Sequence, residues 1–271
     1  MAGRLFRRKA VMHKDLNGFI DTVIDEGLVT AKSASKRRRL RYYLERIFNG
    51  VSFENKVVLD IGGGGGVLSF FAACSGASKV VCLEPEAAGS SSGKLEKFNR
   101  ARNRLQLDQV QLETTTFQNY DPGNAKFDVV ILHDSVNHLD EPACIDLLTD
   151  DTAREVYRSI FSRMHSICSA GAKLIVCDCS RYNFFAHLGV KHPVARSIEW
   201  HKHQSPNTWA RLLYDAGFRN PEIVWRAPSF LRSAGEKLLG NRIAAYFLFS
   251  TFCLYMEKPL RSQSPAGIAD E

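Results

Sequence analysis

Five consecutive glycines, Gly62 to Gly66, place the strongest constraint on how this chain of 271 residues can fold. They follow the segment KVVLDI at residues 56–61, whose short β-branched run is typical of a buried strand. Because glycine has no Cβ, a strand-to-helix turn of this composition lets a ligand lie directly against the main chain. The run therefore predicts a ligand-binding turn at the end of a first strand.

Two common nucleotide-binding turns do not fit the glycine run. A dinucleotide-binding turn requires Gly-x-Gly-x-x-Gly/Ala, and the registers within the run place Val67, Leu68 or Ser69 at the last position. A Walker loop requires Gly-Lys-Ser/Thr, whereas residues 66–68 are Gly-Val-Leu. The pattern that remains is Asp-x-Gly-x-Gly-x-Gly, which is satisfied by Asp60, Gly62, Gly64 and Gly66.

Strand and helix signals alternate along most of the chain. Strands are predicted at 57–59, 80–83, 110–112, 127–132, 173–177, 223–225 and 252–256. Helices are predicted at 11–27, 32–48, 67–75, 93–105, 151–168 and 206–216. Strands separated by helix-length segments pair in parallel through right-handed crossovers, and short apolar runs without alternation fit strands that are covered on both faces. The sequence therefore predicts an α/β protein.

The motif at Asp60–Gly66 resembles the first motif of the class I S-adenosylmethionine-dependent methyltransferases, and the resemblance extends from about residue 40 to 258. It implies a Rossmann-like sheet of seven mostly parallel strands with helices on both faces and an antiparallel last strand. We place a basic N-terminal helical extension, expected to act as a lid, at 1–50. The S-adenosylmethionine-binding methyltransferase domain then occupies 51–259, and a disordered tail 260–271.

The resemblance also implies where S-adenosylmethionine binds. In the family, the acid and glycine turn hold the methionine part of the cofactor, and an acid after the second strand binds the ribose hydroxyls. Glu84 has that second position, and a carboxylate can accept two parallel hydrogen bonds. After the third strand the family often has an acid for the adenine amino group. Here Thr116 takes its place, and Phe117 is a further candidate adenine contact.

The fourth predicted strand ends in His133-Asp134-Ser135-Val136-Asn137-His138, where the family's methyl acceptor approaches. Methyl transfer requires alignment of the acceptor with the methyl group, and a hydroxyl acceptor also requires a base. Histidine can fill that role near neutral pH. We therefore expect His133, Asp134 and His138 to be the catalytic residues, with packing roles for the two histidines as the alternative.

The segment at 205–218 resembles the helix before the sixth strand in ubiquinone-biosynthesis-like small-molecule methyltransferases. In those proteins the preceding segment can line the acceptor pocket, so His201, His203 and Tyr182 are candidate substrate-binding residues. If the segment is extended, His201 and His203 face the same way. No metal is expected at this pair, because no cysteine or carboxylate lies near it at ligand spacing in the sequence.

The formal net charge of +7 is located in the first 50 residues, which hold 12 Lys/Arg and 5 Asp/Glu. The run KRRRLR at 36–41 is either a solvated helix face or a site of attraction for an anionic substrate, a membrane surface or nucleic acid. RNA is disfavoured, because the only adjacent aromatics are Tyr42 and Tyr43, and Tyr43 fits the core stripe of its helix. We expect a small or lipid-linked acceptor, with an anionic acceptor and peripheral membrane contact as options.

The seven cysteines include no C-x-x-C pair, and we expect all of them to be reduced thiols of a cytoplasmic protein. No apolar run reaches the roughly 18 residues of a membrane-spanning helix. Residues 1–12 contain arginines and no acid, and a frayed basic tail is favoured over an organelle-targeting segment.

Methyl transfer to oxygen is expected rather than to nitrogen, because the Asn/Asp-Pro-Pro-Tyr/Phe signature of amino-group methylation is absent from the sequence. A non-catalytic S-adenosylmethionine-binding regulatory module is one alternative, and an RNA methyltransferase that uses the basic N-terminal helix is another. A nicotinamide-dependent oxidoreductase is a third alternative, weakened by the missing third glycine.

Overall fold

The computed structural model describes residues 16–30, 33–48, 50–85, 93–228 and 231–260. The basic tail predicted at 1–12 and all but Leu260 of the predicted disordered tail lie outside these ranges. Within them, no helix combines the length and the apolar character that crossing a membrane requires.

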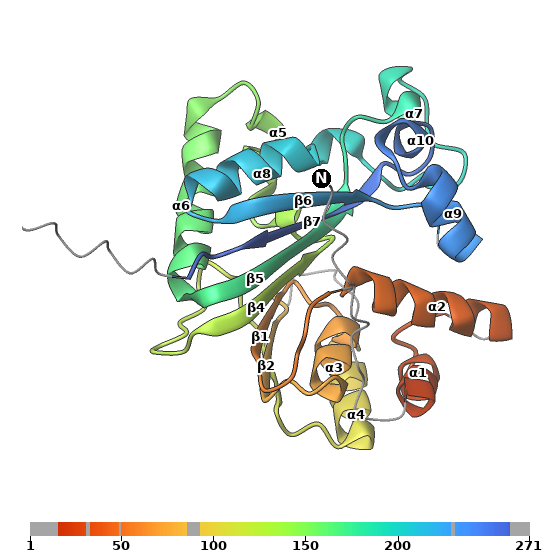
Figure 1. The fold of residues 1–271 in the computed structure, drawn as a ribbon, viewed down its shortest axis with the longest axis vertical. Coiled ribbons are helices and arrows are strands. Elements are labelled where there is room, and N and C mark those ends of the chain that lie inside the picture. The colour runs from red at the N-terminus through yellow and green to blue at the C-terminus, as the bar shows by residue number, and fades with distance from the viewer. Residues whose placement is uncertain (1–15, 31–32, 49, 86–92, 229–230, 261–271) are drawn as a thin grey trace, which may run out of the picture.

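Seven strands of the described residues form one sheet in the order β3-β2-β1-β4-β5-β7-β6 (Figure 1). The pairs from β3 to β5 are parallel, and β7 is antiparallel to both β5 and β6. The predicted fold class, including the antiparallel last strand, is confirmed. The strands are β1 (Val57–Ile61), β2 (Lys79–Leu83), β3 (Val110–Glu113), β4 (Phe127–His133), β5 (Cys168–Cys179), β6 (Arg219–Trp225) and β7 (Thr251–Glu257).

The predicted helices are present and end close to their predicted limits within the described residues, whereas the helices at 141–146, 184–187, 232–239 and 242–247 were not predicted. Side-chain caps explain several of their starts: Asp150 accepts from the N–H of Thr152 at 2.8 Å, and Ser205 accepts from that of Thr208 at 3.1 Å. The helices are α1 (Leu16–Asp25), α2 (Ala34–Ile47), α3 (Val67–Cys74), α4 (Lys94–Leu105), α5 (Glu141–Asp146), α6 (Asp151–Ile167), α7 (Phe184–His187), α8 (Pro206–Asp215), α9 (Arg232–Leu239) and α10 (Arg242–Phe247), with 3₁₀ turns η1 (Val136–His138) and η2 (Trp200–Lys202).

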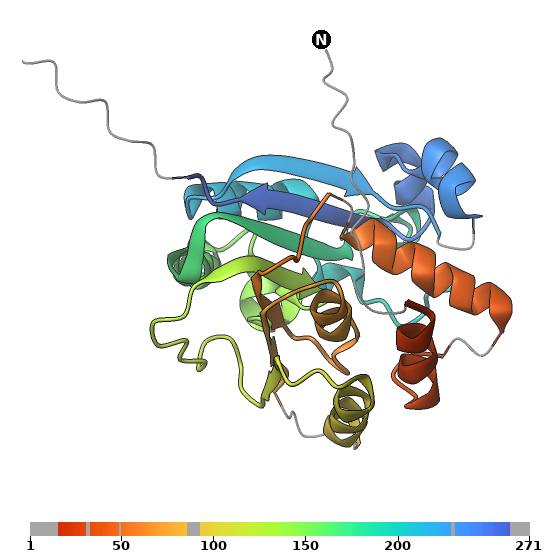
Figure 2. The same ribbon diagram turned by 60° about the horizontal axis from the view of Figure 1, so that its bottom comes forward.

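The two faces of the sheet carry separate cores, because successive side chains of a strand point to opposite faces. Leu59 and Ile61 of β1 pack with residues of α5, α6 and α8, whereas Val58 packs with residues of α1 to α4. Figures 1 and 2 show α1 to α4 gathered on one side of the sheet. Asp60 lies between Leu59 and Ile61 in the strand, so its side chain points to the face of α1 to α4.

The N-terminal helices belong to this core. Phe19 and Val23 of α1 and Leu44 and Ile47 of α2 are buried in the same cluster as α3. The hydroxyl of Tyr255 on β7 donates to the carbonyl of Ile47 at 2.8 Å, which ties the end of α2 to the last strand. These contacts attach helix α2 to the sheet.

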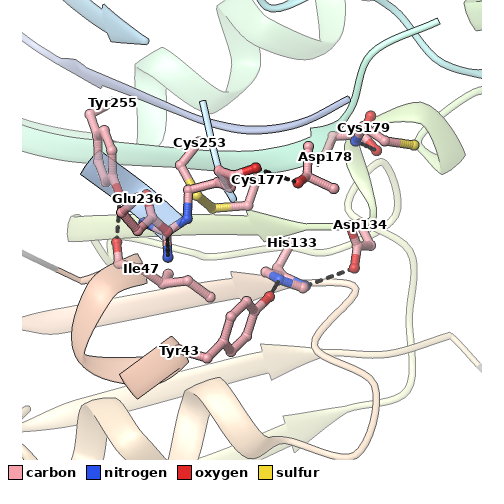
Figure 3. Close-up of a disulfide and its surroundings, with 12 residues drawn as sticks. Tyr43, Ile47, His133, Asp134, Cys177, Asp178, Cys179, Glu236, Cys253 and Tyr255 are labelled. Atoms are coloured by element: carbon pink, nitrogen blue, oxygen red, sulfur yellow. Dashed lines mark hydrogen bonds and ion pairs between the residues drawn. A yellow bond between two sulfur atoms is a disulfide. The ribbon is translucent and has the colours of Figure 1, made fainter. Parts of the chain in front are cut away.

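Cys177 of β5 and Cys253 of β7 form a disulfide (Figure 3). The expectation that all seven cysteines are reduced is wrong for this pair. The two residues lie 76 positions apart in sequence, but antiparallel pairing places them directly opposite each other with their Cα atoms 4.2 Å apart. Sequence spacing alone does not reveal such pairing. Because disulfides are rare in reducing compartments, the cysteines no longer support the predicted cytoplasmic location.

Candidate active site

The glycine turn after β1 is shaped by three residues with positive φ, namely Gly62, Gly64 and Gly66. A Cβ on Gly66 would lie 2.3 Å from Cε2 of Phe98, so close packing of α4 requires glycine there. Gly64, with φ of 58°, differs because a Cβ on it would meet no atom within 4 Å. Since Gly64 also lines a cavity, its missing side chain leaves the main chain open to a ligand.

This glycine-turn cavity has a volume of about 540 Å³ and lies beyond the carboxyl ends of β1, β2 and β4, where open α/β sheets bind their ligands. It brings together seven of the predicted site residues: Gly62, Gly64, Glu84, Thr116, Phe117, Asp134 and His138. Lys94, Gln118 and Ser135 also line it, and the sequence had not singled them out.

Glu84 lies just after β2 and lines the glycine-turn cavity. One carboxylate oxygen, Oε2, accepts from the N–H of Gly64 at 2.9 Å, and Oε1 lies 3.6 Å from the ammonium of Lys94. The side chain is 14% exposed, so the carboxylate faces the cavity while its position is set by the turn and α4. Each oxygen retains a lone pair that a ligand hydroxyl can use.

Thr116 and Phe117 form the far wall of the same cavity. The Thr116 hydroxyl accepts from the N–H of Asn119 at 3.3 Å, which orients it. The ring of Phe117 is buried, with the guanidinium carbon of Arg163 at 5.8 Å from its centroid. These contacts leave a hydroxyl and an apolar ring edge on the wall, which suits a purine base.

Asp60 lies beneath the glycine turn and does not line the cavity. Its Oδ2 accepts from the Ser69 hydroxyl at 2.7 Å, and a Cβ on Gly63 would approach that oxygen to 2.8 Å. Its Oδ1 is buried and has no hydrogen-bond partner among the described residues. Burial raises the pKa of the Asp60 carboxyl to about 6. In this structure Asp60 supports the turn from below, and Gly62 and Gly64 present their main chain to the ligand side.

His133, at the end of β4, is held between two side chains (Figure 3). Its Nδ1 is 3.2 Å from Oδ2 of Asp134, and its Nε2 meets the hydroxyl of Tyr43 from α2. Because a carboxylate only accepts hydrogen bonds, Nδ1 carries the ring proton when the imidazole is neutral, and Nε2 accepts from Tyr43. Burial and the charge of Asp134 raise the pKa of Tyr43, which keeps its hydroxyl protonated.

The sequence missed Tyr43 as a site residue because its helical spacing matches the core stripe. It is partly buried against the core of α1 to α4, as expected, yet its hydroxyl reaches Nε2, the ring nitrogen of neutral His133 that can take a proton. A helical pattern predicts which face of α2 is apolar, and it carries no information on the strand residue that the tip of the side chain meets.

A second cavity, here called the His133 cavity, has a volume of about 420 Å³ and lies on the other side of Asp134. Tyr42 and Tyr43 of α2, His133, and Arg226 after β6 form its polar wall, and the Cys177–Cys253 disulfide lines it too. Asp134 lines both cavities and adopts a φ of 51°, with its N–H donated to the carbonyl of Cys177 at 2.8 Å. The two cavities therefore share one wall residue.

His138 lies on the cofactor side of that wall. It lines the glycine-turn cavity, its Nδ1 is 3.2 Å from Oε2 of Glu141, and its side chain is 58% exposed. The two candidate histidines are thus separated by Asp134, because η1 turns the chain back over the glycine turn after Ser135. Of the two, only His133 reaches the His133 cavity.

Arg226 brings a buried positive charge to the His133 cavity. Its guanidinium is 3.5 Å from Oε1 of Glu236 and its side chain is 9% exposed. Glu236 also lies 3.9 Å from Arg46 of α2, so two guanidinium groups share one carboxylate. The carboxyl groups of Asp134 and Asp178 line the same cavity, so Arg226 is a local positive charge in a lining that contains three acids.

The predicted substrate-binding residues do not converge. Tyr182 and His201 line a third cavity of about 480 Å³, here called the α7 cavity, whereas His203 lines none of the three. The premise that His201 and His203 face the same way is wrong, because residues 200–202 form the 3₁₀ turn η2. A 3₁₀ turn rotates successive side chains by about a third of a circle.

His203 instead lies against the end of β5. Its Nδ1 is 3.0 Å from Oδ1 of Asp178, and potential ligand atoms of Asp178, Cys179 and His203 lie within 4.8 Å of one another. The expectation that no cysteine or carboxylate accompanies His203 is therefore wrong in the folded structure, because the fold brings Asp178 and Cys179 of β5 beside it. The Asp178–His203 hydrogen bond partly offsets the burial that raises the pKa of Asp178.

The basic run on α2 is partly neutralised by ion pairs. Arg37 pairs with Asp21 of α1, and Nε of Arg41 is 3.3 Å from Oε1 of Glu45. Both pairs are exposed and contribute little to stability, but they reduce the charge that this face offers to a polyanion. The pairing fits the reading of the run as a solvated helix face.

Comparisons with known proteins agree with this geometry. A family model described as a methyltransferase domain matches residues 34–223, which is more than half of the chain. Protein arginine N-methyltransferase 6 of Danio rerio is 35% identical over 98 residues, 36% of this chain and 27% of that protein. The probable histone-arginine methyltransferase CARMER of Drosophila melanogaster is 35% identical over 65 residues, 24% of this chain and 12% of that protein. The chain thus covers well under half the length of either relative.

Solved structures share the fold at low identity. An S-adenosylmethionine-dependent methyltransferase from Mesorhizobium loti has a TM-score of 0.50 at 15% identity over 84% of this chain and 99% of that one. The N-methyltransferase NodS from Bradyrhizobium japonicum has a TM-score of 0.51 at 14% identity over 82% and 96%. The [4+2]-cyclase SpnF has a TM-score of 0.54 at 13% identity over 86% of both chains. The chain therefore belongs to the methyltransferase-domain family.

Proposed function

We propose that the enzyme transfers a methyl group to an oxygen atom of a small or lipid-linked acceptor bound in the His133 cavity. The observation that carries this proposal is the position of Asp134, which lines both cavities and contacts the imidazole of His133. An acceptor in one cavity and the cofactor in the other would meet beside a group that can take a proton.

The residues of the glycine-turn cavity have the properties that S-adenosylmethionine requires. Gly64 offers open main chain, Glu84 a carboxylate for vicinal hydroxyls, and Thr116 and Phe117 a wall for the base. When bound, the cofactor supplies an electrophilic methyl group. Asp60 would keep the turn in place from below, through Ser69.

On the acceptor side, His133 would act as the general base. Asp134 holds Nδ1 and its proton, so Nε2 is the nitrogen that takes a proton from an acceptor hydroxyl. Tyr43 occupies that nitrogen in the present structure. An acceptor hydroxyl would therefore take the place of the Tyr43 hydroxyl, and the α2 helix acts as a lid whose tyrosine is exchanged for substrate.

Arg226 would select an acceptor with a negative charge near the reacting hydroxyl. It is a buried cation in the wall of the His133 cavity, and its one described acidic partner, Glu236, is shared with Arg46. A carboxylate or phosphate on the acceptor would complete this group of charges. This group of charges supports an anionic acceptor whose negative charge lies beside Arg226 and away from Asp134 and Asp178.

A nitrogen acceptor is the second candidate, because the curated relatives are described as arginine methyltransferases. The matching stretches cover at most 36% of the chain. The non-catalytic module and the RNA methyltransferase are the remaining candidates, and the paired arginines of α2 give the latter little support.

The decisive experiment incubates the purified enzyme and S-adenosylmethionine bearing a labelled methyl group with metabolite and lipid extracts, followed by mass spectrometry of the labelled product. We expect an O-methylated anionic product.

His133→Gln should lower kcat by about 10²–10⁴-fold. His138→Gln is the matched control, and it should keep kcat within a few-fold of wild type. A labelled nitrogen would replace the oxygen proposal, and unaltered turnover in His133→Gln would remove the base. Absence of any labelled product despite cofactor binding would favour the non-catalytic module.

A further inference from the structure

The exposed apolar side chains of this enzyme are concentrated in one region. Of the eleven large hydrophobic residues that are exposed in the described part of the chain, eight lie at 182–194 or 231–247. Soluble proteins scatter such residues singly, and a concentration of them marks an interaction surface. The eight are Tyr182, Leu188, Val190, Val194, Leu231, Leu238, Ile243 and Phe247.

The two segments form one surface at a corner of the molecule, where Figure 1 shows α7, α9 and α10 together. Phe184 of α7 packs against the ring of Phe247 on α10, with centroids 5.2 Å apart. The loop after α7 is pinned by the buried His192, whose Nε2 is 3.2 Å from the carbonyl of Leu248. Its Nδ1 accepts from the N–H of Val194 at 3.1 Å. The exposed residues therefore sit on an ordered support.

The same surface is positively charged. Residues 181–202 and 231–249 contain seven Lys/Arg and two Asp/Glu. Both acids are occupied in ion pairs: Glu199 with Lys202 at 2.9 Å, and Glu236 with Arg226 at 3.5 Å. The cations Lys191, Arg196, Lys237 and Arg242 are exposed between the apolar side chains.

The α7 cavity opens within this surface and is lined by many basic groups. Arg181, Lys191 and Arg196 contribute to its wall, together with His187 and His201. A concave site of about 480 Å³ with several cations fits a phosphate-bearing headgroup. Cations beside protruding aliphatic side chains are the features of a protein that rests on an anionic bilayer.

The surface also adjoins the His133 cavity. Val194 is both 76% exposed and part of the wall of the His133 cavity, and Ile198 lines the His133 cavity and the α7 cavity. An acceptor that leaves the bilayer beneath this surface would therefore meet the entrance of the His133 cavity first.

We propose that the surface formed by residues 182–198 and 231–247 docks the enzyme on an anionic lipid membrane, with phospholipid headgroups in the α7 cavity. Docking itself stands independently of the reaction, whereas delivery of a lipid-linked acceptor to the His133 cavity rests on the proposed function. The aliphatic side chains insert at the level of the headgroups and the cations bind the lipid phosphates.

A second copy of the chain fits this surface less well. A two-fold interface places the same patch on both sides, so the exposed cations would face one another without acids to pair with. Nucleic acid would use the cations but would leave the aliphatic side chains of Leu188, Ile243 and Leu238 in water. A bilayer with anionic lipids satisfies both kinds of side chain.

Vesicle flotation tests the proposal with the full-length enzyme. One set of vesicles contains only phosphatidylcholine, and the other contains 30% phosphatidylglycerol. We expect wild type to float with the anionic vesicles, and to be released as salt is raised. Ile243→Asp/Phe247→Asp should reduce the bound fraction at least tenfold, and Lys191→Glu/Arg196→Glu should do the same. Leu148→Asp/Tyr214→Asp changes two exposed hydrophobic residues outside the surface and should bind as wild type does.

The outcomes are separable. Lack of wild-type flotation on anionic vesicles, or undiminished flotation of both surface variants, overturns the proposal. A wild-type dimer in light scattering that Ile243→Asp/Phe247→Asp dissociates would assign the surface to a second copy, and release of bound RNA by the charge variant would assign it to nucleic acid. Calorimetry with S-adenosylmethionine checks that each variant is folded. If flotation succeeds and no lipid is methylated, docking stands and the lipid-linked acceptor falls.

Discussion

The carboxylate of Asp134 lies 3.2 Å from Nδ1 of His133. Among the described residues, Asp134 lines both the glycine-turn cavity and the His133 cavity. This contact fixes which nitrogen of the imidazole can accept a proton, and it does so at the boundary between the two cavities. The left-handed backbone of Asp134 turns its side chain back toward His133, a conformation that Asp tolerates better than most residues.

Removal of the Tyr43 hydroxyl should ease acceptor binding. In Tyr43→Phe, Nε2 of His133 has no partner to give up, so we expect KM for the acceptor to fall by about 2–10-fold, the worth of one net hydrogen bond. The Kd for S-adenosylmethionine should not change. Tyr42→Phe is the matched control, since Tyr42 lines the same cavity. A kcat reduced a hundredfold in Tyr43→Phe would instead place the phenol in the path of the proton.

A side chain at Gly64 should block the cofactor. Gly64→Ala puts a methyl group where the cavity is open, and it also holds alanine at a positive φ, which costs about 1–2 kcal/mol. Gly123 offers the control, because its φ of 56° is almost the same and a Cβ on it also meets no atom within 4 Å. Both variants should lose similar thermal stability, and only Gly64→Ala should weaken S-adenosylmethionine binding, by tenfold or more in calorimetry. Equal affinity of the two variants would contradict this assignment of the cavity.

The buried carboxyl of Asp60 should make the stability of the cofactor-free protein depend on pH. Its pKa in the folded protein is raised from 3.8 to about 6, so the folded state prefers the protonated form. Below about pH 4 the carboxyl is protonated in both the folded and the unfolded state, so it does not change the free energy of unfolding. As pH rises from about 4 to about 6 the carboxyl ionises more readily in the unfolded state, so the free energy of unfolding falls. Asp60→Asn lacks this loss, and its unfolding free energy relative to wild type should rise by the order of 2 kcal/mol between pH 4 and pH 8.

Urea denaturation at several pH values measures this difference. Asp108→Asn, which removes an exposed carboxylate, should track wild type. A constant difference between Asp60→Asn and wild type across the range would show that the carboxyl titrates normally.

Reduction should destabilise the protein through the Cys177–Cys253 disulfide. The bond links residues 76 apart, and loss of a native disulfide typically costs about 2–5 kcal/mol. We expect dithiothreitol to lower the melting temperature of wild type and to leave the Cys177→Ala/Cys253→Ala variant unaffected. Cys74→Ala, which changes a buried cysteine outside the disulfide, should keep the response to reductant. Alkylation of all seven cysteines in unfolded protein without reductant would argue against the bond.

The parallel part of the sheet could be predicted from the sequence because each strand carries its own signal. Runs such as residues 127–132 are apolar without alternation, and the glycine turn marks where β1 ends. The helices α7, α9 and α10 were not predicted, since segments of four to eight residues contain too few turns for a helical period to emerge.

The site residues also divide into those that local sequence patterns predict and those that they do not. The residues of the glycine-turn cavity belong to local patterns at strand ends, and Gly62, Gly64 and Glu84 were found from them. The His133 cavity draws Tyr43, Arg226 and Cys253 from distant parts of the chain, and only the pairing of β5 with β7 and the docking of α2 bring them together. No spacing within one segment records such contacts.

The two cavities also differ in when their lining residues leave the ribosome. The walls of the glycine-turn cavity come from residues 61 to 139, whereas those of the His133 cavity extend from Tyr42 to Cys253. Once residues 1–139 have left the ribosome, every residue that lines the glycine-turn cavity has been released, whereas the His133 cavity still lacks lining residues up to Cys253. During synthesis the proposed methyl-donor site can therefore form before the proposed acceptor site.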